Sequence, residues 1–192
     1  MSRIRLLTGK RAGFLGRLIN AATRWREGKE FAPAQIVAHA PRMLLPYAGM
    51  SVFAHGRTQL DPRIRALAMY LAGHLNGCAW CLDFGAHVGI RAGVPAEKLA
   101  KVHAYATDPA FSEAERVALA FADEMTTVGG HVSDETFAEL RRHFSEREVV
   151  ELALAVAAEN FFNRMNAALK VEAQGFCAVP SLSPQPKVAA SA

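Results

Sequence analysis

The sequence lacks a long hydrophobic run, which excludes a membrane-spanning helix. Its most apolar stretch, residues 152–158, is far shorter than the roughly 20 apolar residues that cross a bilayer. Hydrophobic residues nevertheless make up 51% of the 192 residues and charged residues 21%. This balance excludes a wholly disordered chain and is typical of a soluble globular protein. The length suffices for one domain with its own core and is short for two.

Cysteine is scarce, which excludes a framework of structural disulfides. The chain has three cysteines, and small disulfide-stapled proteins use more of them, in even numbers. Cys78 and Cys81 form a Cys-x-x-Cys motif, whereas Cys177 stands alone near the C-terminus. We therefore expect a cytoplasmic protein. In a reducing compartment such a pair is more often catalytic or metal-binding than structural.

Acidic residues are rare in the first 30 residues, which carry eight lysines and arginines against Glu27 and Glu30. A basic segment can contact nucleic acid or an anionic membrane surface. However, the aromatic interleaving and motifs of nucleic-acid-binding proteins are missing, so we expect no nucleic-acid partner. Charged residues also interrupt the apolar stretches, unlike those of a secretory signal. We interpret residues 1–34 as a basic amphipathic helical segment.

The alternating pattern of β-strands is also absent, and the hydrophobic periodicity is helical nearly throughout. Helix boundaries are marked by N-cap residues, proline at a first position and Asn-Gly stops. These signals are Asp61-Pro62, Asn76-Gly77, Ser112-x-x-Glu115 and Ser145-x-x-Glu148. We predict an all-α bundle of about seven or eight helices over residues 35–176. Residues 177–192, rich in Pro, Ser and Ala, are predicted to form a flexible tail.

The cysteine pair falls where a helix is expected to begin, after Asn76-Gly77. The free N–H groups and the dipole of a helix N-terminus stabilise a thiolate, which is the reactive form of cysteine. One thiolate can attack a peroxide or a disulfide, and the second cysteine can resolve the product. Cys78 and Cys81 are therefore the first candidates for catalytic residues.

Two other interpretations of the pair remain open. Both cysteines could be inert core residues, because free cysteine is often buried. A zinc site would need two further ligands, but no second Cys-x-x-Cys is present and the histidines are scattered through the sequence. We expect no metal and no other cofactor. The histidines are His39, His55, His74, His87, His103, His131 and His143.

The segment 75–87 resembles the AhpD-like branch of the carboxymuconolactone decarboxylase family. The resemblance covers residues 35–176 and includes further segments in the same order. They are His39-Ala-Pro41, Leu60-Asp-Pro-Arg63, Arg91-Ala-Gly93-Val-Pro95 and residues 159–166. It implies an all-helical AhpD-like bundle that forms homo-oligomers.

The same resemblance implies a thiol-dependent peroxidase or disulfide reductase. Its substrate would be a small hydroperoxide or a disulfide, and a cellular dithiol would restore the pair. Cys81 would be the attacking thiol and Cys78 the resolving thiol. The apolar residues around Trp80 indicate a dry pocket, which suits an organic hydroperoxide better than a charged substrate.

The sequence departs from the family at the proton relay. The relay Glu and His of the family's peroxidases would fall at Ala66 and Gly85, and neither residue is present. Substitutes could be His74, the i, i+4 neighbours Asp83 and His87, or Glu159 in an otherwise apolar helix segment. For Glu159 we favour the simpler interpretation, a buried ion pair with an arginine such as Arg164 or Arg63.

Two other functions stay open at this point. A lactone decarboxylase is a further activity of the family, although it needs no cysteine pair. A non-catalytic redox-sensing or assembly module would need the disulfide but neither the Glu nor the His of the relay.

Overall fold

The computed structural model describes residues 2–127, 130–179 and 182, and within these ranges every regular element is helical. The all-α prediction is confirmed, and the nine α-helices of the described ranges are close to the predicted seven or eight. They are α1 (Gly13–Glu27), α2 (Ala32–Val37), α3 (Leu44–Ala54), α4 (Pro62–Leu75), α5 (Ala79–Arg91), α6 (Ala96–Ala100), α7 (Glu113–Thr126), α8 (Asp134–His143) and α9 (Glu146–Ala168). No described helix is long and apolar enough to span a bilayer.

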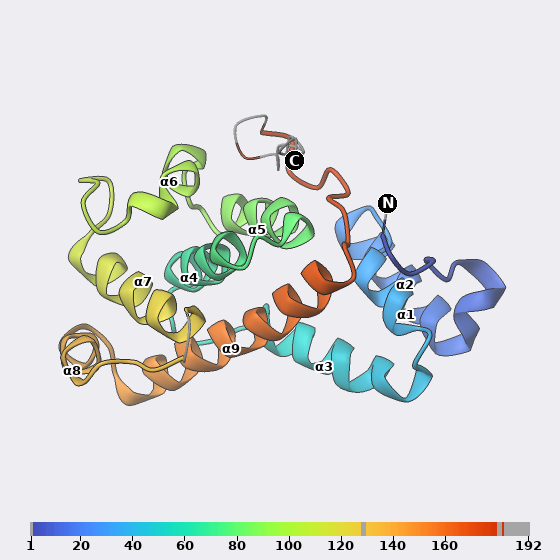
Figure 1. Ribbon diagram of the computed structural model, residues 1–192, viewed down its shortest axis with the longest axis horizontal. Coiled ribbons are helices and arrows are strands. Elements are labelled where there is room, and N and C mark those ends of the chain that lie inside the picture. Colours follow the sequence, from blue (N-terminus) through green and yellow to red (C-terminus); the bar gives the residue numbers. More distant parts are fainter. Residues whose placement is uncertain (1, 128–129, 180–181, 183–192) are drawn as a thin grey trace, which may run out of the picture.

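Helix α4 is the centre of the bundle and packs against α5, α7 and α9 (Figure 1). Its sequence PRIRALAMYLAGHL buries eight consecutive residues, 66–73. A helix that is apolar on every side needs neighbours on every side. The adjacent α5 and α9 both carry residues of the candidate site, so α4 holds the two site-bearing helices together.

The start and stop signals of the sequence lie at the expected helix ends. Asp61 caps α4 by accepting a hydrogen bond from the backbone N–H of Arg63. Ser112 and Ser145 each form a complete capping box, at α7 and α9. Gly77 has φ +63° in the turn between α4 and α5, a conformation that favours glycine. Cys78 is thereby placed at the N-cap of α5.

The N-terminal helices α1, α2 and α3 lie together at one end of the bundle (Figure 1). In α1 the predicted apolar face is divided: Phe14 and Leu18 are exposed, whereas Leu15 and Ile19 are partly buried. The buried side of α1 packs toward α2 and α3. Helix α2 crosses the predicted boundary at residue 34, and that boundary stays a prediction.

The C-terminal segment folds back over α5 after α9 ends. Asp83 of α5 accepts hydrogen bonds from the backbone N–H groups of Gln174, at 2.7 Å, and Cys177, at 2.9 Å. Phe176 packs against Trp80, and Leu182 is buried. The remainder of the predicted tail, residues 180–181 and 183–192, lies outside the described residues, and the flexible tail stays a prediction.

Candidate active site

Cys78 and Cys81 are joined by a disulfide at the N-terminus of α5. Both are buried, with 1% and 4% of their surface exposed. The backbone N–H of Cys81 donates to the Sγ of Cys78 at 3.2 Å, so the helix start contributes a donor to a sulfur. Cys177, the third cysteine, is buried and free.

Helix α9 supplies polar side chains to the other side of the disulfide. The Nδ2 of Asn166 donates to the Sγ of Cys81 at 3.5 Å. Asn163 lies one turn earlier on the same face. Gly73 of α4 is close to both Asn163 and Cys81, because a Cβ added at this glycine would lie 3.9 Å from the Oδ1 of Asn163 and 3.6 Å from the Cβ of Cys81. Both asparagines are fully buried. Three of their amide atoms have no hydrogen-bond partner among the described residues: the Nδ2 and Oδ1 of Asn163 and the Oδ1 of Asn166.

Glu159 lies one further turn back on α9, and 8% of its surface is exposed. The alternative of a buried ion pair is not what the structure shows: Arg63 pairs with Asp61, and Glu159 has no ion pair within the described ranges. Burial raises the pKa of the Glu159 carboxyl to about 8. Burial, and then the nearby Glu159, also raise the pKa of Tyr47. Glu159 is therefore mostly a neutral acid at pH 7.

Cys81 lines a small inner cavity of about 30 Å³, together with Glu159. Cys78 is not among its lining residues. An outer cavity of about 370 Å³ adjoins it and lies between α1, α3 and α5. The two cavities share six lining residues, Phe31, Tyr47, Ser51, His55, Phe84 and Val88. The two adjacent cavities, which we call the hollow, thus have Cys81 and not Cys78 in their lining.

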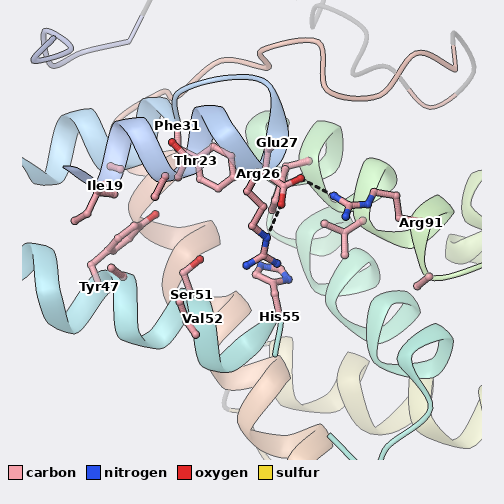
Figure 2. Close-up of a pocket in the computed structure, with 16 residues that line it drawn as sticks. Ile19, Thr23, Arg26, Glu27, Phe31, Tyr47, Ser51, Val52, His55 and Arg91 are labelled. Carbon is pink, nitrogen blue, oxygen red and sulfur yellow. Dashed lines mark hydrogen bonds and ion pairs between the residues drawn. The ribbon is translucent and has the colours of Figure 1, made fainter. Parts of the chain in front are cut away.

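Helix α3 and its C-cap residue contribute three polar side chains that were not predicted as site residues. Tyr47, Ser51 and His55 follow one another at four-residue intervals and face the outer cavity (Figure 2). Burial, and then the nearby Arg65 and Arg26, lower the pKa of His55 to about 4, so the imidazole is neutral at pH 7. The four-residue spacing in an otherwise apolar helix was the available signal.

Ala66 and Gly85, where the family relay would place Glu and His, both line the inner cavity. The positions inferred from the resemblance therefore do face Cys81. The same cavity is lined by Glu159 from α9 and His55 from α3. A carboxyl and an imidazole are thus present at this site, but other helices supply them.

The other predicted helpers lie elsewhere. His74 stacks on His103, with ring centroids 5.9 Å apart, and burial and His103 lower its pKa. Asp83 holds the C-terminal segment, and the Nε2 of His87 lies 3.3 Å from the Oε2 of Glu27. Asp83 and His87 therefore each have partners other than one another. Of the four candidates, only Glu159 lines the inner cavity together with Cys81.

Among the described residues, one group of side chains lies close enough together to hold a metal ion. It consists of the exposed or partly exposed Glu113, Glu139 and His143 on α7 and α8. It contains neither cysteine of the pair. The two cysteines are instead bonded to each other.

The comparisons with known proteins agree with this architecture. A model of the carboxymuconolactone decarboxylase family matches residues 38–124. The uncharacterized protein YnjA of Escherichia coli (strain K12) is 31% identical over 125 residues, which are 65% of this chain and 68% of YnjA.

Two solved structures share the fold at lower identity. The debrominase Bmp8, as a cysteine-to-alanine variant in complex with 2,3,4-tribromopyrrole, has a TM-score of 0.78 at 22% identity and covers 92% of this chain and 95% of its own. The AhpD core of an uncharacterized peroxidase-related protein from Ralstonia eutropha JMP134 has a TM-score of 0.74 at 18% identity, with 91% and 94% covered. The family match and the relative YnjA establish that this chain belongs to the carboxymuconolactone decarboxylase family, and the solved structures show that it has an AhpD-like fold.

Proposed function

We propose that the protein is a thiol-dependent peroxidase that reduces small organic hydroperoxides. Cys81 is the attacking thiol, Cys78 the resolving thiol and Glu159 the proton donor. The observation that carries the proposal is the inner cavity, where Cys81 and a buried, protonated carboxyl line the same space. The apolar walls suit an organic substrate, and no cofactor is required.

The first step is attack by the Cys81 thiolate on the outer oxygen of the hydroperoxide. The O–O bond breaks, Cys81 becomes a sulfenic acid, and the leaving alkoxide takes the proton of Glu159 to form an alcohol. The Cys78 thiol then attacks the sulfenic sulfur. The disulfide forms and water leaves with the Cys78 proton.

An external dithiol restores the pair by thiol–disulfide exchange and is itself oxidised to a disulfide. As Cys81 is released, its thiol proton passes to the Glu159 carboxylate, which regenerates both thiolate and acid. A disulfide substrate in place of the peroxide would make the protein a disulfide reductase. We further propose a cytoplasmic location and a homo-oligomer.

Reductive dehalogenation is a second candidate function. Bmp8 is a debrominase, and its fold covers nearly the whole chain, including the N-terminal helices that wall the outer cavity. In this reaction two thiols and an aromatic halide would give the disulfide, the dehalogenated ring and hydrogen halide. The same Cys81 and the same acid would act.

The proposal is tested by titrating the thiols of the reduced protein before and after one equivalent of cumene hydroperoxide. We expect rapid loss of two thiols, their recovery with dithiothreitol, and many turnovers under excess of both reagents. A single stoichiometric oxidation without turnover would instead show a redox sensor. Thiols that react only as slowly as free cysteine would refute the peroxidase. A lactone decarboxylase activity that Cys78→Ser leaves unchanged would favour a lactone decarboxylase.

A further inference from the structure

The mouth of the outer cavity carries charged side chains, unlike its walls. Glu27, at the end of α1, has a side chain that is only 4% exposed, and it pairs with Arg26 at 2.9 Å and Arg91 at 2.7 Å. In Figure 2 the Arg26 side chain extends toward His55, and Arg91 reaches Glu27 from α5. Two guanidinium groups thus share one carboxylate at the entrance.

Among the residues that line the outer cavity, Arg26, Glu27 and Arg91 leave one unit of positive charge in excess, and His87 lies outside this lining, 3.3 Å from Glu27. Only the Nε of Arg26 and one terminal nitrogen of Arg91 contact Glu27. Within the described ranges, the terminal nitrogens of Arg26 have no other partner, so they are available to a ligand. Deeper in the hollow the neutral His55 imidazole and the protonated Glu159 add no charge at pH 7.

Between the mouth and Cys81 the walls are largely apolar and partly aromatic. Phe31, Phe84 and Val88 line both cavities, and Val52 lines the outer one. A volume of about 370 Å³ is within the size range of small-molecule pockets. The hollow is therefore positively charged at its mouth, largely apolar and uncharged along its length, and neutral at its inner end.

We propose that this hollow binds organic monoanions: an apolar, ring-sized body lies between the aromatic walls, and a carboxylate or similar group contacts Arg26 and Arg91. This proposal rests on the proposed function for its statement that the reactive end points to Cys81. The binding preference itself does not depend on any reaction. It narrows the substrate from organic hydroperoxides in general to those with one anionic group at the far end.

The test is calorimetric titration of the oxidised protein, in which no thiol can react, with 2-naphthoate and with the uncharged 2-naphthylmethanol. At low ionic strength we expect naphthoate to bind about fivefold more tightly, since a partly exposed guanidinium contributes a modest attraction. Arg26→Gln should bring the two dissociation constants close together. Arg17→Gln is the matched control, because it removes the same charge from the exposed side of α1, outside the cavity lining.

Equal binding of the two probes to wild type would overturn the proposal. So would a preference that Arg17→Gln reduces as much as Arg26→Gln, because the effect would then be that of net charge. If Arg26→Gln does not fold, Arg91→Gln provides the same comparison. Naphthoate binding without peroxide turnover would refute the proposed function and leave this inference standing, and turnover without binding would do the reverse.

Discussion

Asn166 places a fully buried amide against the sulfur of Cys81, and the fully buried Asn163 lies one turn earlier on α9. A buried amide atom without a partner costs free energy. In the disulfide state three such atoms on these two side chains lack partners among the described residues. On reduction, the Cys81 thiolate is a better acceptor for an amide N–H than a disulfide sulfur. Asn166 therefore favours the thiolate form of Cys81.

We predict that Asn166→Leu raises the pKa of the Cys81 thiol. A hydrogen bond to a charged group contributes about 1.5–3 kcal/mol, so the rise should be about one unit or more. The pH dependence of iodoacetamide alkylation in a Cys78→Ser background measures it. Asn20→Leu, the same change at a buried asparagine of α1, should leave the pKa unchanged. An unchanged alkylation profile in Asn166→Leu would show that the amide does not act on the thiolate.

Glu159 makes stability depend on pH in an unusual direction. Its pKa is raised from 4.5 to about 8 by burial, so the folded state holds a proton that the unfolded state releases. Burial of Glu159 therefore does not lower the free energy of unfolding through its ionisation below pH 4.5. It lowers this free energy by a growing amount as the pH rises from 4.5 toward 8. We predict that Glu159→Gln raises the melting temperature at pH 8.5 by roughly 5 °C or more relative to wild type, and has little effect at pH 4.5. Equal shifts at both pH values would contradict the assignment.

At the scale of the elements, helix positions were predictable because their signals are local. The α4–α5 boundary at Asn76-Gly77 and the capping boxes of α7 and α9 depend on residues within one turn. The Cys-x-x-Cys helix start followed from the same signals. These features do not depend on how distant helices pack.

The surroundings of Cys81 depend on tertiary packing and were only partly predictable. Glu159 was a candidate because a carboxylate in an apolar helix needs an explanation, but nothing local placed it beside a cysteine 78 positions away. Asp83 and His87 have the spacing of a pair on one helix. In the structure Asp83 instead accepts hydrogen bonds from distant backbone N–H groups, and His87 contacts Glu27. Helix spacing identifies which residues can meet, and the fold decides which do.

Asp83 joins α5 to the C-terminal segment through two backbone N–H groups. We predict that Asp83→Asn lowers the free energy of unfolding by about 2 kcal/mol, because the buried amide can accept fewer and weaker hydrogen bonds than the carboxylate. Urea denaturation measures this loss. The exposed Asp134→Asn should cost less than about 1 kcal/mol. If the two variants were equally stable, the segment would not depend on Asp83.

At the scale of the whole molecule, α9 carries an apolar stripe on its outer side. Val150, Leu154, Ala157 and Phe161 recur at helical spacing and are exposed. Exposed apolar surface of this kind often marks an interface.

We predict that Val150→Glu with Leu154→Glu reduces the molar mass in light scattering to that of a smaller assembly. Phe137→Glu, at an exposed position of α8, should not. A wild-type monomer of 20.8 kDa would refute the homo-oligomer.

Intact-mass analysis of Cys78→Ser after one equivalent of cumene hydroperoxide tests directly whether Cys81 is the attacking thiol. We predict that one oxygen atom is added at Cys81, because Cys81 rather than Cys78 lines the inner cavity. Adding Glu159→Gln should slow this step about a hundredfold at pH 7, since glutamine has no acidic proton to donate. Oxidation of Cys78 in the Cys81→Ser protein instead, or an equal rate without the carboxyl, would contradict it.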